Sequence, residues 1–376
     1  MVVSSRNFRL AIGYQLLVAC GAAKTQESSP VAEPRGGESA PAPNKSEKPQ
    51  VFEAVASAAD VVAPWVRPER SSHLAVPVPK GRARERWRLP LESSVDPAFV
   101  LAAGTRILVQ GRPKGAPTAR QSPFVLLDAQ GRKIASDLIS GDLVRLEPAA
   151  GKFYGIGGSE PPSAWQLSDG SHAPDKLGTD DARSVQGALG GRAATHDGIY
   201  VYIQPSGVEI DARAAGRHRT VVEPPVEPLD GAIDDEANLH LLVRQDKELA
   251  LWTTALSGGS IGRVRIGPLR RDRASVPPIV GAAVRVVVLD DRLVAFGRDG
   301  RLLWERKGAL TGGATLTSDD RLLVASDAKV LAIDPSGRAT EVATAPKEVF
   351  VTAPIVTGGG LLVVASGAAL HAYAFE

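Results

Sequence analysis

One short apolar pattern recurs seven times along this chain of 376 residues and constrains its fold more than any other feature. Each copy is a run of about six residues in which apolar and aromatic side chains dominate, as is typical of a buried β-strand. The copies begin at residues 106, 152, 198, 239, 284, 321 and 360. A spacing of about 37 to 46 residues is typical of repeats that each form one four-stranded sheet. The sequence therefore predicts an all-β domain built from repeated sheets.

The residues that follow these runs repeat as well. VRVVVL is followed by RLVAFGRDG and RLLWERKG, and RLLVAS is followed by KVLAIDPSG and RATEVAT. Asp and Gly recur where a tight turn must join two strands, because Asp can hydrogen-bond nearby backbone and Gly accepts a positive φ. Each repeat therefore predicts the second, third and fourth strands of one sheet. Apolar residues on both faces of the middle strands indicate sheets that are covered on both sides.

The two ends of the repeat region are each incomplete. The last copy, GLLVVASGAALHAYAFE, ends at Glu376 after its third strand, whereas RWRLPLES, from Arg86, precedes the first copy. Pairing of these two segments would give one sheet built from both ends of the chain and would leave no open edge. We therefore expect seven four-stranded sheets over residues 85–376, closed by an N-terminal and a C-terminal strand.

The hairpin at residues 292–308 resembles the repeat of PQQ-like, quinoprotein-type β-propellers. The residues that match the pattern are Leu293, Val294, Ala295, Gly300 and Trp304. Asp334 and Gly337 belong to a second copy that lacks the tryptophan, and Trp87 is expected to take its place on the closing strand. The resemblance implies a β-propeller, here with seven blades, in which these residues have structural roles. Trp165 and Trp252 are expected on third strands, where they pack between sheets.

The N-terminus carries the one cysteine of the chain, Cys20. Arg6 and Arg9 precede an apolar run of about ten residues, which is too short to span a membrane and is typical of a signal peptide. LVAC, at residues 17–20, resembles the lipobox of bacterial lipoproteins. The resemblance implies removal of residues 1–19, lipidation of Cys20 and, with Gly21 next, sorting to the outer membrane. A chance cysteine after an ordinary signal peptide, or in a buried strand, is the alternative.

Residues 20–84 are expected to connect this anchor to the folded domain at 85–376. The segment 21–50 is rich in Pro, Ala, Ser, Glu and Lys, and such a composition predicts a disordered tether. Apolar residues at helical spacing predict one short amphipathic helix at residues 51–62. The basic run KGRARERWR, from Lys80, is interpreted as a solvated entry into the first strand rather than as a lipid-binding patch.

No catalytic, cofactor or metal site is predicted. GGSIG at residues 258–262 matches the G-x-S-x-G pattern but precedes a strand-like run instead of a helix, so it is interpreted as a loop. The aspartate pairs 290–291 and 319–320 are interpreted as turns, and residues 234–236 lack the ligand spacing of a calcium loop. The six histidines include no pair at metal-ligand spacing. One cysteine allows neither an internal disulfide nor a cysteine metal cluster.

These features predict a binding or scaffolding module for protein or glycan partners in the bacterial envelope, attached to the membrane by its N-terminal lipid. A net charge of +2 gives no reason to expect a nucleic acid partner. The repeat in a lipoprotein is similar to the family of outer-membrane β-barrel assembly lipoproteins, which implies a role in assembly, although that resemblance implies eight blades. The alternative is a periplasmic enzyme with an axial site, either a quinone-dependent oxidoreductase or a glycan lyase.

Overall fold

The computed structural model of the protein describes residues 61–62, 76–92, 95–103, 106–114, 121–140, 142–147, 152–156, 163–166, 175–176, 192–196, 199–204, 206–212, 217–259, 261–268, 277–289, 292–308 and 310–376. Every described residue belongs to one compact unit, residues 51–376. All the regular elements in these segments are β-strands. Within the same segments, no helix long and apolar enough to cross a membrane is present.

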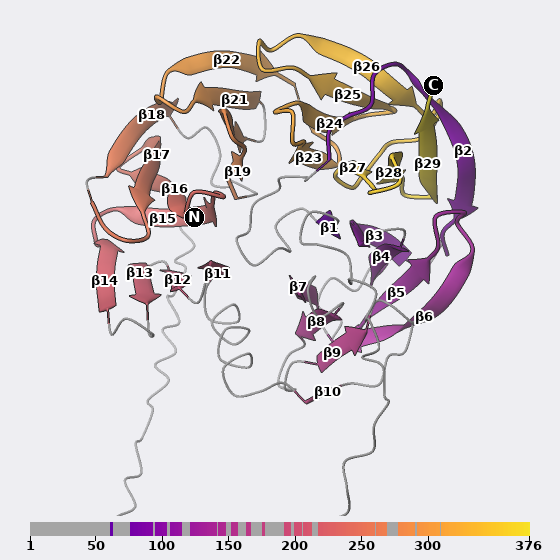
Figure 1. Cartoon of the computed structure of the whole chain (residues 1–376), viewed down its shortest axis with the longest axis horizontal. Helices are drawn as coiled ribbons and strands as arrows, with labels where there is room; N and C mark the ends of the chain where they lie inside the picture. Colours follow the sequence, from indigo (N-terminus) through magenta and orange to yellow (C-terminus); the bar gives the residue numbers. More distant parts are fainter. Residues whose placement is uncertain are drawn as a thin grey trace, which may run out of the picture. The chain divides into compact units, whose positions relative to one another are not determined.

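The described strands form seven antiparallel sheets, whose succession can be followed in Figure 1. The sheet nearest the start of the chain has the order β1 (Val61–Val62), β3 (Val95–Ala103), β4 (Arg106–Pro113), β5 (Gln121–Leu127) and β6 (Lys133–Ser140). The next sheet has the order β7 (Asp142–Glu147), β8 (Lys152–Ile156), β9 (Ser163–Gln166) and β10 (Asp175–Lys176). The third has the order β11 (Arg192–His196), β12 (Ile199–Gln204), β13 (Gly207–Ala212) and β14 (Arg217–Val222).

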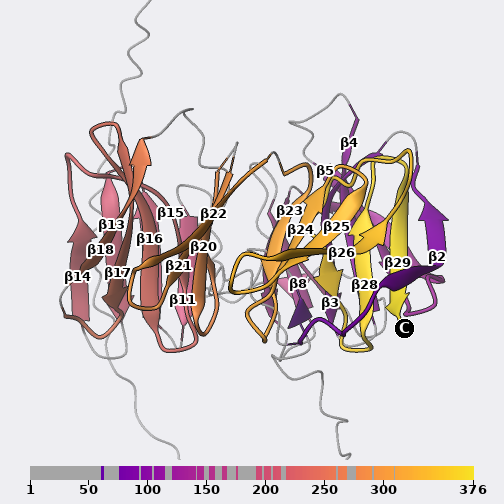
Figure 2. The same ribbon diagram turned by 90° about the horizontal axis from the view of Figure 1, so that it is seen from above.

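Three further sheets repeat this four-stranded arrangement (Figure 2). The first consists of β15 (Glu227–Ile233), β16 (Asn238–Gln245), β17 (Glu248–Ala255) and β18 (Gly262–Pro268). The second consists of β19 (Ile279–Val280), β20 (Val284–Val288), β21 (Arg292–Gly297) and β22 (Leu302–Lys307). The third consists of β23 (Gly313–Leu316), β24 (Leu322–Ser326), β25 (Lys329–Ile333) and β26 (Ala339–Thr344).

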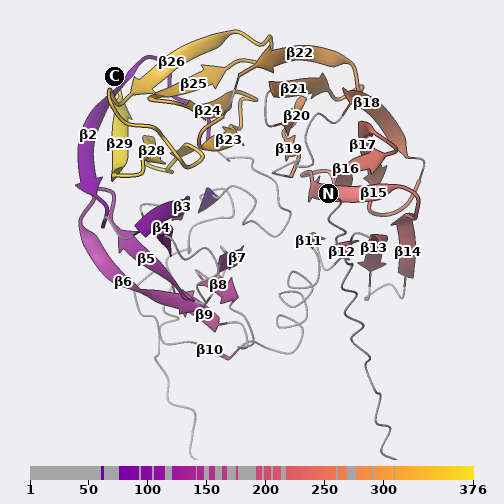
Figure 3. The ribbon, with the colours of Figure 1, turned by 180° about the vertical axis from the view of Figure 1, so that it is seen from behind.

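The last sheet contains strands from both ends of this unit. Its order is β27 (Ile355–Val356), β28 (Leu361–Ala365), β29 (Ala369–Phe375) and β2 (Ala83–Pro90). In Figure 3 the indigo strand β2 runs beside the yellow strand β29. The pairing is antiparallel, with Trp87 opposite Ala372 and Leu89 opposite Leu370. The expected pairing of RWRLPLES with AALHAYAF is therefore present. We call this four-stranded unit the composite sheet.

Each of the seven apolar runs is the second strand of its four-stranded repeat, as the sequence predicts: β4, β8, β12, β16, β20, β24 and β28. All five residues of β20 and of β28 are buried. Burial of every residue requires cover on both faces, because successive side chains of a strand point to opposite faces. The expectation that the middle strands are covered on both sides is thus met in these two sheets.

Apolar clusters between neighbouring sheets supply this cover. One cluster joins Leu242, Leu249 and Leu251 of the β15–β18 sheet to Val287 and Phe296 of the β19–β22 sheet. Others join the β11–β14 and β15–β18 sheets, and the β19–β22 and β23–β26 sheets. First strands also meet across these boundaries, because β15 contacts β19 and β19 contacts β23. The sheets therefore pack face to face in sequence order over residues 199–376.

The ordered part of the domain begins earlier than the expected boundary at residue 85. Strand β2 starts at Ala83, and Val78 is only 2% exposed because it packs into the core cluster that includes the composite sheet. Arg321 Nη2 donates to the carbonyl oxygen of Val78 at 2.5 Å. Residues 76–84, which were expected in the tether, thus contact the β23–β26 sheet through hydrogen bonds and apolar burial.

The helix expected at residues 51–62 is wrong for its last two residues. Val61 and Val62 form β1, which pairs with Ala103 and Ala102 of β3. An edge strand offers unpaired backbone groups, and β-branched valines fit an extended pairing strand better than a helix. Residues 51–60 lie outside the described residues, as do the signal peptide 1–19, Cys20 and the rest of the tether up to residue 75, apart from β1.

Candidate functional site

Trp304 lies on the fourth strand of its sheet and packs on a turn of the next sheet. Its partner across the strands is Ala295 on β21. A Cβ built on Gly337 would lie 2.8 Å from Trp304 Cγ and 3.0 Å from its Cβ, so the indole rests on the glycine backbone. Gly337 has φ +88°, a value that glycine adopts without strain. The glycine thus allows both the turn and the close approach of the indole.

Trp87 repeats this arrangement on the composite sheet. Its cross-strand partner is also an alanine, Ala372, and its ring lies within about 3 Å of a Cβ built on Gly131, the turn glycine of the β3–β6 sheet. Trp87 Nε1 donates to the carbonyl oxygen of Ala129 at 3.0 Å. Trp304 Nε1 is buried without a hydrogen-bond partner. The two tryptophans therefore occupy equivalent places but differ in one hydrogen bond.

The two remaining repeat residues also lie at turns. Gly300, with φ +79°, contacts Val264 of the preceding sheet in the way that Gly337 contacts Trp304. The carboxylate of Asp334 accepts hydrogen bonds from the backbone amides of Ser336 and Arg338 at 2.9 and 3.0 Å. The side-chain hydrogen bond from Ser336, more than these backbone bonds, lowers the pKa of Asp334. These residues build hairpins and contacts between sheets.

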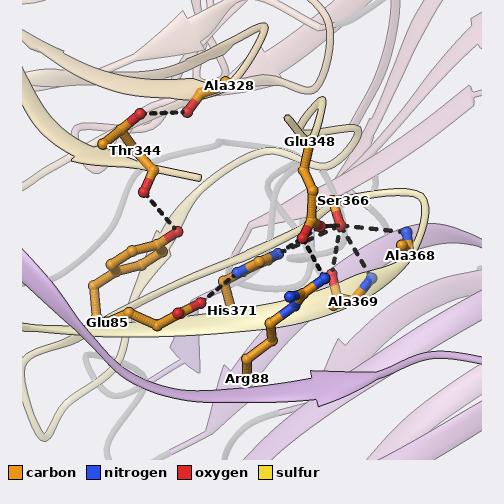
Figure 4. A network of polar contacts seen from close by, with 10 residues as sticks. Glu85, Arg88, Ala328, Thr344, Glu348, Ser366, Ala368, Ala369 and His371 are labelled. Atoms are coloured by element: carbon orange, nitrogen blue, oxygen red, sulfur yellow. Dashed lines mark hydrogen bonds and ion pairs between the residues drawn. The ribbon is translucent and has the colours of Figure 1, made fainter. Parts of the chain in front are cut away.

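A polar cluster around the buried His371 joins β2 to the end of the chain (Figure 4). His371 on β29 is 1% exposed, and its Nδ1 lies 2.7 Å from Glu85 Oε1 while its Nε2 lies 3.0 Å from Glu348 Oε2. Arg88 and the hydroxyl of Ser366 also bind the Glu348 carboxylate. Burial alone would raise the pKa of Glu348, but the hydrogen bonds from Ser366 and His371 and the charge of Arg88 hold it below its usual value.

Ser366, His371 and Glu85 lie in the order of a serine, histidine and acid triad, since Ser366 Oγ is 3.4 Å from His371 Nε2. Catalysis would require an accessible hydroxyl whose proton passes to the histidine. Ser366 is 1% exposed, and its hydroxyl instead donates to Glu348 and accepts from the amides of Ala368 and Ala369. The cluster therefore holds the composite sheet together, and its serine is inaccessible to a substrate.

A cleft of about 630 Å³ opens between the β15–β18 and β19–β22 sheets. The residues that line it include Leu251, Thr253, Val264, Arg285, Phe296 and Asp299. Arg298 also lines the cleft and forms an ion pair with Glu236. We call this space the arginine cleft. It combines an apolar wall with a few polar groups, as ligand sites commonly do.

Arg285, on β20, is the unusual residue of the arginine cleft. It is 6% exposed, and its Nε and Nη1 atoms are buried without a protein hydrogen-bond acceptor. Its cross-strand partner is Phe296, which packs against the β15–β18 sheet, so Arg285 faces the same sheet. Burial lowers the pKa of Arg285, and the charges of Asp234, Asp299 and Asp320 oppose this shift.

A hydrogen-bond chain leads from a buried carboxylate to the cleft. Asp234 Oδ2 lies 2.9 Å from His240 Nε2, and Thr253 Oγ1 lies 3.0 Å from His240 Nδ1. Burial lowers the pKa of His240, which favours the neutral imidazole. An ionised carboxylate only accepts, so Nε2 carries the proton and Nδ1 accepts from the Thr253 hydroxyl. The lone pairs of Thr253 Oγ1 are thereby left to accept a donor from the cleft.

The remaining sequence predictions fall on several parts of the structure. GGSIG follows β17, and its last residue, Gly262, begins the strand β18, so a strand and not a helix follows the motif, as expected; Ser260 is outside the described residues. Trp252 lies on the third strand β17, packs between sheets and carries the Arg263 guanidinium 4.3 Å from its ring centroid. Trp165 lies on the third strand β9. Within the described segments, no group of three His, Cys, Asp or Glu residues is placed to hold a metal ion.

Sequence reasoning missed the arginine cleft and the chain from Asp234 to Thr253. One signal was available: Arg285 in VRVVVL and His240 in LHLLV are polar residues inside strands whose neighbours are all apolar. A polar group in such a strand must be bonded internally or exposed to a cavity. The carboxylate of Asp234 also closes a turn, since it accepts hydrogen bonds from the backbone amides of Glu236 and Asn238 at 3.0 and 2.8 Å.

Comparison with known proteins identifies the repeat. Residues 289–376 match the PQQ_2 family, described as outer membrane protein assembly factor BamB. No curated protein matches the chain. BamB from Moraxella catarrhalis is similar in structure, with 13% identity over 78% of this chain and 100% of that chain, at a TM-score of 0.43.

A second similar structure is a catalytically inactive virginiamycin B lyase from Staphylococcus aureus, with 11% identity over 77% of this chain and 99% of that chain, at a TM-score of 0.49. A streptogramin B lyase shares 11% identity over 77% of this chain and 97% of its own, at a TM-score of 0.47. Within the present chain, the repeat match and the four-stranded antiparallel sheets agree. Residues 289–376 carry a BamB-like, PQQ-type repeat, and the sheets are those expected of a β-propeller.

Proposed function

We propose that this protein is a lipid-anchored binding module of the bacterial envelope, whose sheets close into a seven-bladed β-propeller. Three observations support the architecture: seven sheets in which the strands of each repeat pair in chain order, with β1 as a fifth strand on the first sheet; face-to-face packing of successive sheets; and the composite sheet made by β2 and β29. Closure through a sheet that contains both ends of the domain would leave no open edge at the joint.

Binding, rather than catalysis, is proposed because of the arginine cleft. The observation that supports binding is the cleft itself, a space of about 630 Å³ whose lining combines apolar side chains with a few polar ones, among them Arg285 and Thr253. The proposal assigns no cofactor, no metal and no nucleic acid partner. It assigns a protein partner of the envelope in preference to a glycan.

The location is proposed from the N-terminus. Lipidation of Cys20 would attach the domain to a membrane, and the Pro- and Ser-rich sequence that follows would serve as its tether. Gly21 favours the outer membrane through the lipobox resemblance. A part in outer-membrane protein assembly is the finer proposal, supported by the description of the family that matches residues 289–376.

The test compares the wild-type chain with Cys20→Ala in bacterial cells. Intact mass of the purified protein reports acylation, cell fractionation reports membrane association, and affinity capture from solubilised membranes reports partners. We expect an acylated wild type that sediments with membranes and recovers specific envelope proteins, and an unmodified variant that does neither. A wild type that is not acylated, or that recovers the same proteins as an unrelated tagged lipoprotein, would contradict the proposal.

A further inference from the structure

His371, on β29, is a buried histidine that meets a carboxylate at each of its ring nitrogens. Figure 4 shows the ring between Glu85, on β2, and Glu348, in the loop between β26 and β27. Nδ1 lies 2.7 Å from Glu85 Oε1, Nε2 lies 3.0 Å from Glu348 Oε2, and the residue is 1% exposed. The ring therefore connects β2 to this loop across the composite sheet.

The hydrogen-bond roles at these two contacts indicate how many protons the ring carries. A neutral imidazole has one donor and one acceptor, an imidazolium ion has two donors, and an ionised carboxylate can only accept. Burial opposes ionisation of Glu348, but hydrogen bonds from Ser366 and His371 and the charge of Arg88 lower its pKa, so it is ionised near neutral pH. Ser366 donates its proton to Glu348 and has none for the ring. Only a ring with two N–H groups satisfies both contacts.

The balance of charge agrees with a charged ring. The charged groups around His371 are Glu85 and Arg88 from β2 and Glu348 from the loop before β27. Two carboxylates and one guanidinium leave one negative charge, which an imidazolium ion cancels. Cancellation is favourable because a buried charge without a partner costs free energy. Tyr373, a further titratable neighbour on β29, stays neutral because burial raises the pKa of its phenol.

Aromatic rings close the site to water. Phe350 and Tyr373 are 0% and 2% exposed, and their ring centroids lie 5.6 and 6.1 Å from that of His371. Exclusion of water strengthens the attraction between the imidazolium ion and the carboxylates. A neutral ring would instead direct a lone pair at one carboxylate. The two protonation states therefore differ in how firmly they hold β2.

We propose that His371 is an imidazolium ion at neutral pH that clasps β2 onto the composite sheet through Glu85, and that the clasp opens as the pH rises and the ring loses its second proton. A histidine that folding holds in its charged form contributes stability at low pH and loses it as the pH rises through its titration in the folded protein. Release of β2 would uncover the edge of β29, whose backbone groups could then pair with another strand. This pH-sensitive attachment goes beyond the proposed binding function.

The first test measures the protonation of His371 by NMR in the full-length protein with histidine labelled in its ring nitrogens. At about pH 7.5, one unit above the ordinary histidine pKa of about 6.5, both nitrogens of His371 should carry protons. His240, which faces one carboxylate and one hydroxyl, should carry one. The signal that is absent from His371→Gln, or that moves in Glu85→Gln, identifies His371. A neutral His371 at this pH would overturn the proposal.

Glu85→Gln tests the carboxylate that β2 supplies. Glutamine keeps the size of the side chain and removes its charge, so the titration of His371 should move down by about one pH unit or more, a tenfold loss of proton affinity. Glu209→Gln is the matched control, because Glu209 pairs at 3.5 Å with the exposed His218. It should move the titration of His218 by less than about 0.3 unit, since exposed pairs are weak. Equal shifts of the two histidines would contradict a buried clasp.

Hydrogen exchange, measured by mass spectrometry, tests the attachment of β2. The reference within the same sample is β22, the fourth strand of another sheet, because the chemical effect of pH on exchange applies to both strands. The ratio of exchange in residues 83–90 to that in residues 302–307 should rise several-fold as the pH passes through the measured titration of His371. In Glu85→Gln the rise should occur at the lower pH of its own titration. A ratio that stays constant through the titration would overturn the proposal even if His371 is charged.

Discussion

At the scale of single residues, Trp87 and Trp304 take equivalent packing positions but differ in whether the indole N–H is hydrogen-bonded. Both indoles rest on a turn glycine of the next sheet, but only Trp87 finds an acceptor for its N–H, the carbonyl oxygen of Ala129. A buried N–H without an acceptor costs free energy, whereas a made hydrogen bond contributes about 1 kcal/mol. The two positions should therefore respond differently to the same substitution.

Replacement of each tryptophan by phenylalanine tests this difference. Trp87→Phe and Trp304→Phe lose similar ring area, but only Trp87→Phe loses a hydrogen bond, whereas Trp304→Phe removes an unsatisfied donor. We expect Trp87→Phe to lower the free energy of unfolding by about 1 to 2 kcal/mol more than Trp304→Phe. Urea unfolding of the two variants measures the difference. Equal costs would show that ring packing alone matters at both positions.

Gly337 and Gly360 form a second matched pair. Their φ values are +88° and +77°, so alanine carries a similar backbone strain of about 1 to 2 kcal/mol at both. Only at Gly337 would the new Cβ meet an indole, and it would meet the base of that side chain. We expect Gly337→Ala to cost about 1 to 3 kcal/mol more than Gly360→Ala in urea unfolding. A cost no larger than that of Gly360→Ala would contradict the close packing of Trp304.

At the scale of strands and sheets, the composite sheet depends on charged contacts around the buried His371. Glu348, which precedes β27, binds Ser366, His371 and Arg88, and these contacts hold its pKa below its ordinary value of 4.5. A carboxylate whose pKa is lower in the folded state contributes stability above the unfolded-state pKa and loses it as the pH falls through the folded-state pKa.

Glu348→Gln should therefore flatten the dependence of stability on pH. The free energy of unfolding of wild type should fall as the pH decreases below about 4.5, because protons must bind Glu348 at the cost of its native contacts. The variant lacks this titration, so the gap between the two proteins should narrow with decreasing pH. Urea unfolding from pH 6 to pH 3 measures both curves, and parallel curves would contradict the role of Glu348.

Most of the strands and their grouping into sheets could be predicted from the sequence, whereas the arginine cleft could not. The strand period, the turn glycines such as Gly300 and the two incomplete ends are local patterns, so they indicated the sheets and the pairing of β2 with β29. The arginine cleft is lined by residues from two different sheets, such as Thr253 on β17 and Arg285 on β20. Strands buried on both faces do not alternate in polarity, so the sequence does not show which face each residue occupies. The strand β1 was missed because two residues are too few to show the alternation of polar and apolar side chains that indicates a strand.

At the scale of the whole domain, β2 supplies the fourth strand of the composite sheet. A chain that starts at residue 92 would lack β2 and expose the edge of β29. The unpaired backbone groups of that edge could then pair with a strand of another molecule. We expect this truncation to unfold at a lower temperature and to aggregate in size-exclusion chromatography. A chain that starts at residue 76 lacks β1 but keeps Val78 and β2, and it should unfold at a higher temperature than the shorter chain and resist this aggregation. Equal behaviour of the two truncations would contradict closure of the domain through β2.

Site-specific photocrosslinking in intact cells tests the central claim, that the arginine cleft binds an envelope protein. A photoreactive residue at position 298, in the cleft, should crosslink a discrete envelope protein, and the crosslink should disappear in the Arg285→Met background. The same residue at position 265, outside the cleft lining, should give no such product. Crosslinks of equal yield from both positions, or a product at position 298 that survives Arg285→Met, would contradict the account.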